Sequence, residues 1–338
     1  MRRIACIFLS LLLLCTACAS APVFDGDGGY AFYVKNGELM MTVLDTARTV
    51  QVTSHLNWDV ADPRAAGLVR LSDDHTRLFY LDAKEDNDDP VRYLYVKELR
   101  GDGATTCLDR VSGDLFDIAK DGQTALYLQS KPAGGYALYM HDMTAPVLLT
   151  ERLCGFGFTA KEDMPYYVVE EDGERRYTVV KDGDTRTLTE TEFETETGGR
   201  RPKRYAYEGE LDTRSMGVLW ADGAIVDDEF RYTGYEVYHG DRMLYFASED
   251  GEAPYTLRQY VKGKKPQTVD AVYLLLAGYT TDGCPLYLQN ICKEDRTGDL
   301  MMLRDGQTVT LDHGVSGPVS LCYITDLTDS VQKHMRWE

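Results

Sequence analysis

The sequence lacks the short motifs that mark many catalytic and metal sites. Its six histidines form no HExxH zinc motif, the five cysteines after Cys18 form no CxxC pair, and no Walker or GxGxxG glycine pattern is present. Gly314, Ser316 and Gly317 fall one residue short of a GxSxG elbow, and we interpret them as the loop before a strand. We therefore predict no catalytic residue and no metal ligand set.

Basic residues are scarce relative to acidic ones. The chain has 36 Lys and Arg against 55 Asp and Glu, which gives a formal net charge of −19. A surface this acidic repels phosphate backbones and anionic headgroups, so we expect no nucleic-acid partner. Cations and basic peptides remain as ligands, and the alternative is that the charge only keeps the protein soluble.

Tryptophan is rare, whereas tyrosine is abundant. The 338 residues include 3 Trp and 23 Tyr, and Thr and Val are frequent. This composition favours strands over helices. With 43% hydrophobic residues the chain can bury a core, so wholesale disorder is excluded. We expect an all-β protein.

The only long apolar run is too short to span a bilayer. Arg2 and Arg3 precede the apolar stretch 4–14, and small residues follow it up to Ser20. Such a segment is typical of a secretory signal, because a membrane span needs about 20 apolar residues. We predict a signal peptide at 1–17 and an exported protein.

The end of this segment resembles the bacterial lipobox, in which a cysteine becomes the lipidated N-terminus. Thr16 and Ala17 precede Cys18, although Cys15 stands where the family pattern has Leu, Val or Ile. The resemblance implies lipidation of Cys18. The alternative is cleavage after Ala19 or Ala21, which would release a secreted protein.

Five cysteines follow Cys18, an odd number that cannot all pair. They are Cys107, Cys154, Cys284, Cys292 and Cys322. We interpret most of them as small buried apolar residues, with one disulfide left open.

A hairpin pattern recurs about every 40 residues. Two apolar stretches flank a turn signal at 41–53, 94–109, 138–150, 177–189, 216–228, 257–270 and 300–312. Further strands are predicted between these hairpins, the first of each pair at 68–71, 115–119, 156–160, 192–196, 235–239 and 274–279. Four strands per unit and this period indicate a β-propeller, whose four-stranded units are called blades.

Seven hairpins predict seven blades, with six or eight as the alternatives. A single apolar strand remains at 319–324, and we expect it to complete the blade begun at 30–34 and so close the ring. The predicted organisation is therefore a linker at 18–24, a propeller at 25–326 and a tail at 327–338.

The turn stretches resemble a known repeat family. SDDHTRLFY (72–80), AKDGQTALY (119–127), AKEDMPYYV (160–168) and TTDGCPLYL (280–288) are similar to the Ser-Pro-Asp-Gly-x-x-Leu-x-Phe signature of TolB-type, WD40-like propeller repeats. Asp-Gly is kept in two of these copies and the proline in none. The resemblance implies the propeller fold, a bacterial surface lipoprotein and a habit of binding proteins or ligands rather than one chemistry.

Acidic residues gather in the loops that follow second strands. Because these loops and those between blades lie on one face of a propeller, we predict a binding rim there, formed by Trp58, Asp59, Asp86, Asp88, Asp89, Glu171, Asp172, Phe230, Tyr232, Glu249, Asp250, Glu294 and Asp295. The rim suits a cationic peptide, a basic protein or Ca²⁺. The 86–89 stretch lacks the glycine and glutamate of a calcium loop, so no cofactor is predicted, with Ca²⁺ the one metal considered. Solvated hairpin tips are the alternative explanation.

The sequence thus favours a noncatalytic module that binds a protein, peptide or glycan on the outer face of the bacterial cell membrane. We expect a monomer that contacts the membrane through its lipid anchor only. The alternative is a propeller-type glycoside hydrolase or lyase with paired carboxylates at the central channel.

Overall fold

The structure is a computed structural model that describes most of the chain after residue 28. The described residues are 29–53, 69–84, 91–100, 103–112, 115–202, 207, 209–212, 217–230, 236–248 and 253–319. The predicted signal peptide, Cys18, the linker 18–24 and the tail 327–338 lie outside them. The described part consists of strands and one short helix, so the all-β prediction is confirmed.

Five of the sheets have four antiparallel strands each. The first contains β1 (Tyr30–Lys35), β2 (Glu38–Val43), β3 (Arg48–Gln51) and β27 (Gly317–Pro318). The second contains β4 (Val69–Leu71), β5 (Arg77–Lys84), β6 (Val91–Glu98) and β7 (Thr105–Val111). The third contains β8 (Phe116–Ile118), β9 (Ala125–Ser130), β10 (Tyr136–His141) and β11 (Pro146–Thr150).

Two further four-stranded sheets lie later in the chain. One contains β12 (Gly155–Phe158), β13 (Pro165–Glu171), β14 (Glu174–Lys181) and β15 (Asp184–Leu188). The other contains β23 (Ala277–Tyr279), β24 (Pro285–Gln289), β25 (Gly298–Arg304) and β26 (Gln307–Val315).

A seven-stranded sheet lies between these two and consists of two units. The first unit contains β16 (Leu211–Asp212), β17 (Gly217–Ala221) and β18 (Ala224–Phe230). The second contains β19 (Val237–His239), β20 (Arg242–Ala247), β21 (Tyr255–Val261) and β22 (Gln267–Val272). A single backbone pair, Phe230 with Ala247, joins β18 to β20.

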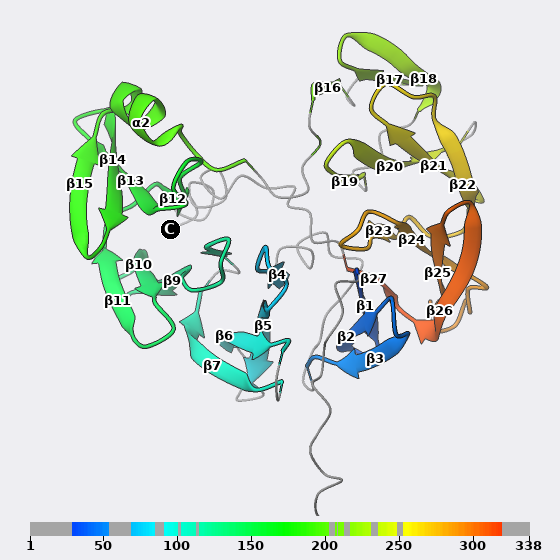
Figure 1. The fold of residues 1–338 in the computed structure, drawn as a ribbon, viewed down its shortest axis with the longest axis horizontal. Coiled ribbons are helices and arrows are strands. Elements are labelled where there is room, and N and C mark those ends of the chain that lie inside the picture. Colours follow the sequence, from blue (N-terminus) through cyan, green and yellow to red (C-terminus); the bar gives the residue numbers. More distant parts are fainter. Residues whose placement is uncertain are drawn as a thin grey trace, which may run out of the picture.

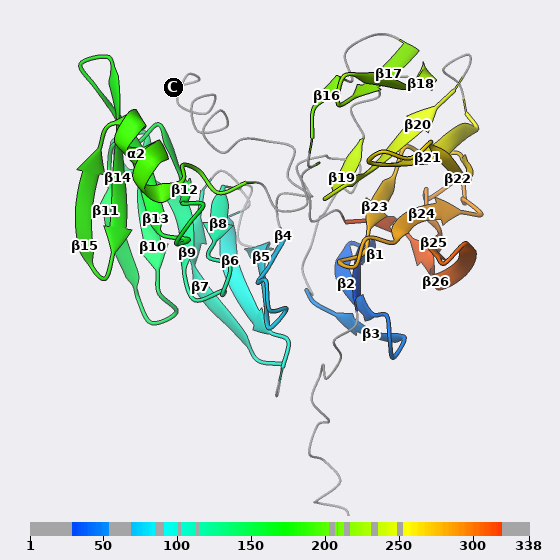
Figure 2. The same cartoon turned by 45° about the horizontal axis from the view of Figure 1, so that its top comes forward.

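The sheets stand around a common centre, as Figures 1 and 2 show. First strands such as β4, β12, β19 and β23 lie near the centre, and last strands such as β7, β15, β22 and β26 lie at the periphery. The repeated four-stranded unit predicted from the 40-residue period is therefore present.

Turn chemistry explains why the outer hairpins were predictable. Asp182–Gly183, Asp222–Gly223 and Asp305–Gly306 all have positive φ, between 51° and 85°, and each pair connects two strands directly. Two-residue turns of this kind match the twist of a hairpin and favour Asn or Asp before Gly. The predicted hairpins at 177–189, 216–228 and 300–312 are confirmed.

One predicted strand is wrong. Residues 192–196 belong to helix α2 (Glu190–Thr197), not to a strand. Thr189 and Glu192 form a capping box at its start, and Gly198 ends it with a left-handed conformation, φ 74°. These end signals, together with helix-favouring glutamates, outweigh the alternation of Phe193 with polar residues.

Apolar side chains of neighbouring sheets share core clusters. One cluster joins the β1–β3, β4–β7 and β8–β9 strands, and another joins β9–β11 to β12. Further clusters join β17 to β20–β21, β20–β22 to β23–β24, and β24–β26 to β1. Burial of these side chains supplies the main attraction between neighbouring sheets.

A β-bulge recurs near the end of the outermost strand. In five hairpins the outer strand carries one extra residue relative to its partner, namely Leu108, Leu149, Val226, Val269 and Leu311. The residue after the bulge is Asp109, Thr150, Asp227, Asp270 or Asp312. A bulge bends a strand and re-aims the following side chain.

Three of the aspartates that follow a bulge accept hydrogen bonds from the next unit along the chain. Tyr127 on β9 donates to Asp109 on β7 over 2.6 Å, and Tyr245 on β20 donates to Asp227 on β18. Gln289 on β24 donates to Asp270 on β22. Burial, and next the bond to Asp109, raises the pKa of Tyr127 well above its usual value, so the phenol stays a donor.

The same contact joins the last sheet to the first. Tyr33 on β1 donates to Asp312 on β26 over 2.9 Å, and Lys35 Nζ lies 2.7 Å from the other carboxylate oxygen. Burial acts to raise the pKa of Asp312, but the bonds from Lys35, His313 N–H and Tyr33 outweigh it and lower that pKa. The carboxylate is therefore charged at neutral pH.

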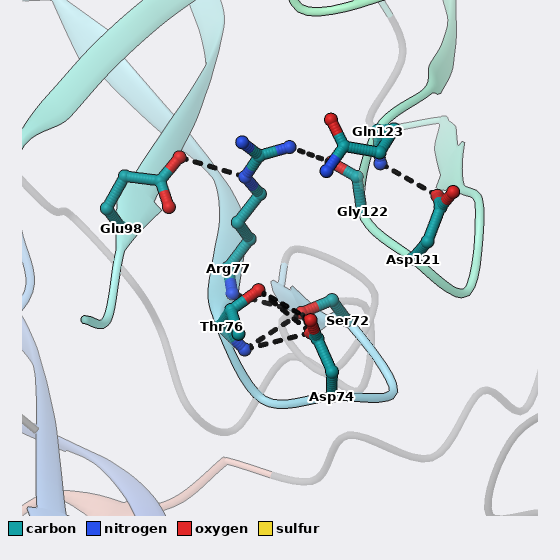
Figure 3. A network of polar contacts seen from close by, with 8 residues as sticks. All are labelled: Ser72, Asp74, Thr76, Arg77, Glu98, Asp121, Gly122 and Gln123. Carbon is teal, nitrogen blue, oxygen red and sulfur yellow. Dashed lines mark hydrogen bonds and ion pairs between the residues drawn. The ribbon is translucent and has the colours of Figure 1, made fainter. Parts of the chain in front are cut away.

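Turns at the opposite edge of the sheets are also bonded to one another. Arg77 donates to the Gly122 carbonyl of the following sheet over 3.0 Å and pairs with Glu98 (Figure 3). Arg242 donates in the same way to the Gly283 carbonyl over 2.7 Å. Gly122 has φ 64°, and a Cβ there would lie 3.0 Å from the Ser72 Cβ. The Asp-Gly turns therefore serve the packing of neighbouring sheets.

The chain's end pairs with its beginning, but only its first residues are described. β27 lies beside β1, with Gly317 opposite Val34 and Pro318 opposite Tyr33. The Val319 N–H donates to the Phe32 carbonyl over 2.8 Å. The rest of the predicted closing strand at 319–324 lies outside the described residues.

The bond between Tyr127 and Asp109 predicts a specific loss of stability. We expect Tyr127→Phe to lower the free energy of unfolding by about 1 to 3 kcal/mol, because a hydrogen bond to a charged acceptor is lost. Tyr273→Phe is the control, since Tyr273 is 62% exposed, and it should change little. Urea unfolding followed by circular dichroism measures both, and equal midpoints for the two variants would contradict the role of the bond.

Candidate functional site

The inner strands around the centre carry mostly apolar and small side chains. Val69, Leu71, Phe116 and Ile118 on β4 and β8 are buried, and β12 has the sequence GFGF. Two charged residues interrupt these strands, Arg70 on β4 and Asp117 on β8. Charges in such strands are costly unless they are paired.

Arg201 is the hub of a polar network between neighbouring inner strands. Its guanidinium lies 2.7 Å from Asp163 and 3.0 Å from Asp117, and it donates to the Ile118 carbonyl over 2.8 Å. The side chains of all three charged residues are 16 to 18% exposed. Arg201 thereby joins β8 to the turn between β12 and β13.

Arg70 lies on the inner strand β4 and is buried more deeply than Arg201. Its Nη1 donates to the Val69 carbonyl over 3.1 Å, and its Cζ lies 4.8 Å from the Phe116 ring centroid. Burial lowers the pKa of Arg70 to about 9, which leaves it charged at neutral pH. Arg201 repeats the arrangement, with its Cζ 4.8 Å from the Phe158 ring centroid.

We call Arg70, Phe116, Asp117, Phe158, Asp163 and Arg201 the arginine cluster. Two guanidinium groups and two carboxylates balance each other in charge, and both carboxylates accept bonds from Arg201. Glycoside hydrolysis by paired carboxyl groups needs one of them to carry a proton. A pair bridged by a guanidinium suits a clamp between strands instead.

Two predicted rim residues lie in a tight turn. Glu171 pairs with Glu174 across the β13–β14 hairpin, and Asp172 and Gly173 form its two-residue tip with φ 53° and 80°. Glu171 and Asp172 are exposed. Their local role is turn chemistry, and their carboxylates point to solvent at the end of one sheet.

Glu294 and Asp295 lie in the β24–β25 loop of a different sheet. One oxygen of Asp295 accepts bonds from the N–H and hydroxyl of Thr297, at 3.0 and 2.8 Å. These bonds lower the pKa of Asp295, so it is charged at neutral pH. Both residues are exposed, and the structure places them in a different sheet from Glu171 and Asp172.

The other predicted rim residues cannot be placed. Those outside the described residues are Trp58, Asp59, Asp86, Asp88, Asp89, Tyr232, Glu249 and Asp250. The backbone of Phe230 ends β18, but its side chain is not described. The rim therefore stays a prediction.

The arginine cluster was missed in the sequence. Its signal was visible as a charged residue inside the otherwise apolar stretches LVRL and LFDI. Arg201 and Asp163 gave no such signal, because both lie in polar stretches between strands. Their meeting depends on the three-dimensional path of the chain.

Cysteines and metal ligands contribute no site in the part of the chain that the structure describes. Cys107, Cys154, Cys284 and Cys292 are free thiols. Within the described ranges, no three His, Cys, Asp or Glu side chains are grouped to hold a metal ion. The single described helix, α2, is too short and too polar to cross a membrane.

Because Arg201 is largely buried, we predict that its loss lowers the free energy of unfolding far more than the loss of a surface arginine. We expect Arg201→Gln to cost about 3 to 5 kcal/mol, because two poorly exposed carboxylates lose their cation. Arg186→Gln is the control, since Arg186 forms an exposed bidentate pair with Glu196 and should cost at most about 1 kcal/mol. Urea unfolding measures both, and similar costs would mean that the cluster is no clamp.

The comparisons with known proteins give similarities to solved structures. No protein-family model matches the sequence, and neither does a curated protein. TolB from Acinetobacter baumannii is 14% identical, with 88% of this chain and 68% of that chain covered and a TM-score of 0.37. The β-propeller domain of the Trilobed protease from Pyrococcus furiosus is 12% identical, with 87% and 97% covered and a TM-score of 0.45.

A third similar structure is the acylaminoacyl peptidase from Pyrococcus horikoshii. It is 11% identical, 84% of this chain and 50% of that chain are covered, and the TM-score is 0.44. TolB and related β-propeller proteins are thus the structures to which the chain is similar. At these identities the similarity concerns the fold alone.

Proposed function

We propose that the protein is an exported, lipid-anchored β-propeller of seven blades that binds a protein, peptide or glycan without catalysis. The observation that supports binding without catalysis is the pairing of the carboxylates near the centre with Arg201. Asp117 and Asp163, the carboxylates next to Arg201, are bonded to it, whereas the described loop acids Glu171, Asp172, Glu294 and Asp295 are exposed. Exposed charge on rigid hairpins is available to a ligand.

The proposed ring of seven blades treats β16–β18 and β19–β22 as separate blades. Its closure between the last and first blades is supported by the pairing of β27 with β1 and by the bond from Tyr33 to Asp312. A closed ring leaves no free sheet edge at its centre, which protects it from pairing with other chains.

The proposed location is the outer face of the bacterial membrane. The support is the sequence before residue 18, together with the acidic composition that disfavours binding to anionic lipid by the propeller itself. The anchor would be the lipid on Cys18, and the propeller would present its loops to the exterior as a monomer.

The lipid anchor is tested by Cys18→Ala in a bacterial host. We expect wild type to enter the detergent phase and the variant to enter the aqueous phase, because several acyl chains anchor stably where none does. Cys15→Ala is the control and should behave as wild type. A variant at Cys18 that still enters the detergent phase would contradict lipidation.

Charge removal tests the binding rim. We expect the combined variant Glu171→Gln, Asp172→Asn, Glu294→Gln and Asp295→Asn to bind an immobilised decalysine peptide about tenfold more weakly, because four surface charges are lost. Asparagine keeps the turn geometry at Asp172 and Asp295. Binding is measured by surface plasmon resonance at low salt.

The matched control removes the same charge from turns at the opposite ends of the sheets. It combines Asp121→Asn, Asp142→Asn, Asp182→Asn and Asp305→Asn, all exposed turn residues. Equal weakening by both variants would mean that net charge alone attracts the peptide, which would contradict a rim. A glycan array run beside it separates binding from cleavage, since hydrolysis of any glycan would favour the enzyme alternative.

A further inference from the structure

One junction between neighbouring sheets differs from the others. The core cluster around Phe193 contains residues of β13–β15 and α2, together with Cys154 and Met164 from the same part of the chain. The Phe193 ring stacks on Tyr177 with centroids 4.5 Å apart and lies 4.8 Å from Tyr166. Helix α2 thus covers the face of this sheet that a neighbouring sheet would otherwise cover.

The next unit along the chain, β16–β18, has two large apolar side chains exposed on one face, Trp220 and Ile225. Leu219 and Ala221 are buried against Met243, Tyr245 and Tyr260. Side chains alternate along a strand, so Trp220 lies on the opposite face. It is 37% exposed, and its direct cross-strand partner Ile225 is 58% exposed.

Such a pair of large apolar side chains on a sheet face indicates a contact surface. In both views the α2 side of the β12–β15 sheet and the β16–β18 unit follow one another around the centre and are drawn well apart (Figures 1 and 2). The helix side is acidic, because Glu190, Glu192 and Glu194 are exposed. An occupant of this junction should therefore be apolar on one side and basic on another.

The chain itself contains a segment of this chemistry. In residues 327–338, LTDSVQKHMRWE, apolar residues recur every fourth position at Leu327, Val331 and Met335, and Lys333 and Arg336 stand beside them. We propose that residues 327–338 dock between α2 and the exposed face of β17–β18, with their apolar side on Trp220 and Ile225.

The tether is long enough for this docking. The described chain ends at Val319, which is buried next to the inner strand β27. The 19 residues that follow span up to about 60 Å when extended. A chain of 338 residues has a radius of gyration of about 20 Å when folded, so the segment can reach any side of the ring.

Tethering also favours this segment over a separate basic peptide as the occupant of the junction. A tethered segment has an effective concentration of about 1 mM for a site within its reach, far above that of most free ligands. The tail therefore occupies the junction first, and an external ligand with the same chemistry has to displace it.

Photo-crosslinking in the full chain tests the docking. We propose the substitution Trp220→p-benzoylphenylalanine, illumination, proteolysis and mass spectrometry. The expected product joins residue 220 to a peptide within 327–338 of the same chain, with a yield that does not depend on protein concentration. The same group placed at Val309, which is 44% exposed on another sheet, should give no such product.

A second pair of variants keeps the test independent of folding defects. Val331→Asp with Met335→Asp should lower the crosslinked fraction about tenfold, because two apolar contacts are lost, whereas Ser330→Asp should leave it unchanged. A yield that is insensitive to the double variant overturns the proposal. A product with α2 alone, a product between two chains, or no product within the chain overturns it as well.

Discussion

Apolar contact between two sheets has no direction, so it attracts the sheets without fixing how they slide along one another. Hydrogen bonds between neighbouring sheets remove this freedom in the present fold. Tyr127 with Asp109, Tyr245 with Asp227 and Tyr33 with Asp312 each join the second strand of one unit to the last strand of the preceding unit. The bulge before each aspartate makes the bond possible, because it turns the carboxylate toward the neighbour. The position of one unit relative to the next thus depends on the extra residue of the bulge that precedes the aspartate.

Charged side chains near the centre of the molecule differ from those on its hairpin tips in whether they are paired. At the centre, Arg201 and Arg70 neutralise Asp117 and Asp163 among the inner strands. Exposed acids such as Asp172, Asp182 and Asp305 lie on hairpin turns, where water screens their charge. The described charges of the arginine cluster are therefore paired, while the described acids of the hairpin tips are exposed.

The outer hairpins could be predicted because their signals are local. The two-residue turns at 182–183, 222–223 and 305–306 require positive φ, and Asp-Gly is one of the few residue pairs that adopt it readily. The alternating stretches on both sides of each turn then allow only one register of the hairpin. Helix α2 was missed because the alternation of polar and apolar residues in EFETE is typical of a strand. The capping box from Thr189 to Glu192 depends on only two residues and was not recognised. The arginine cluster was missed for another reason. Arg201 meets Asp117 across 84 residues, a contact set by the path of the chain between sheets.

The sheet that contains both β1 and β27 imposes an order on events. β1 is the first described strand to be synthesised, whereas its partner residues Gly317 and Pro318 are among the last described residues to follow. Until then the inner edge of β1 has unpaired backbone groups, and Tyr33 has no Asp312 to bond. The first sheet is thus the last to be finished. A chain that is not yet complete keeps that edge open, which gives proteases and chaperones a simple means to recognise an incomplete molecule.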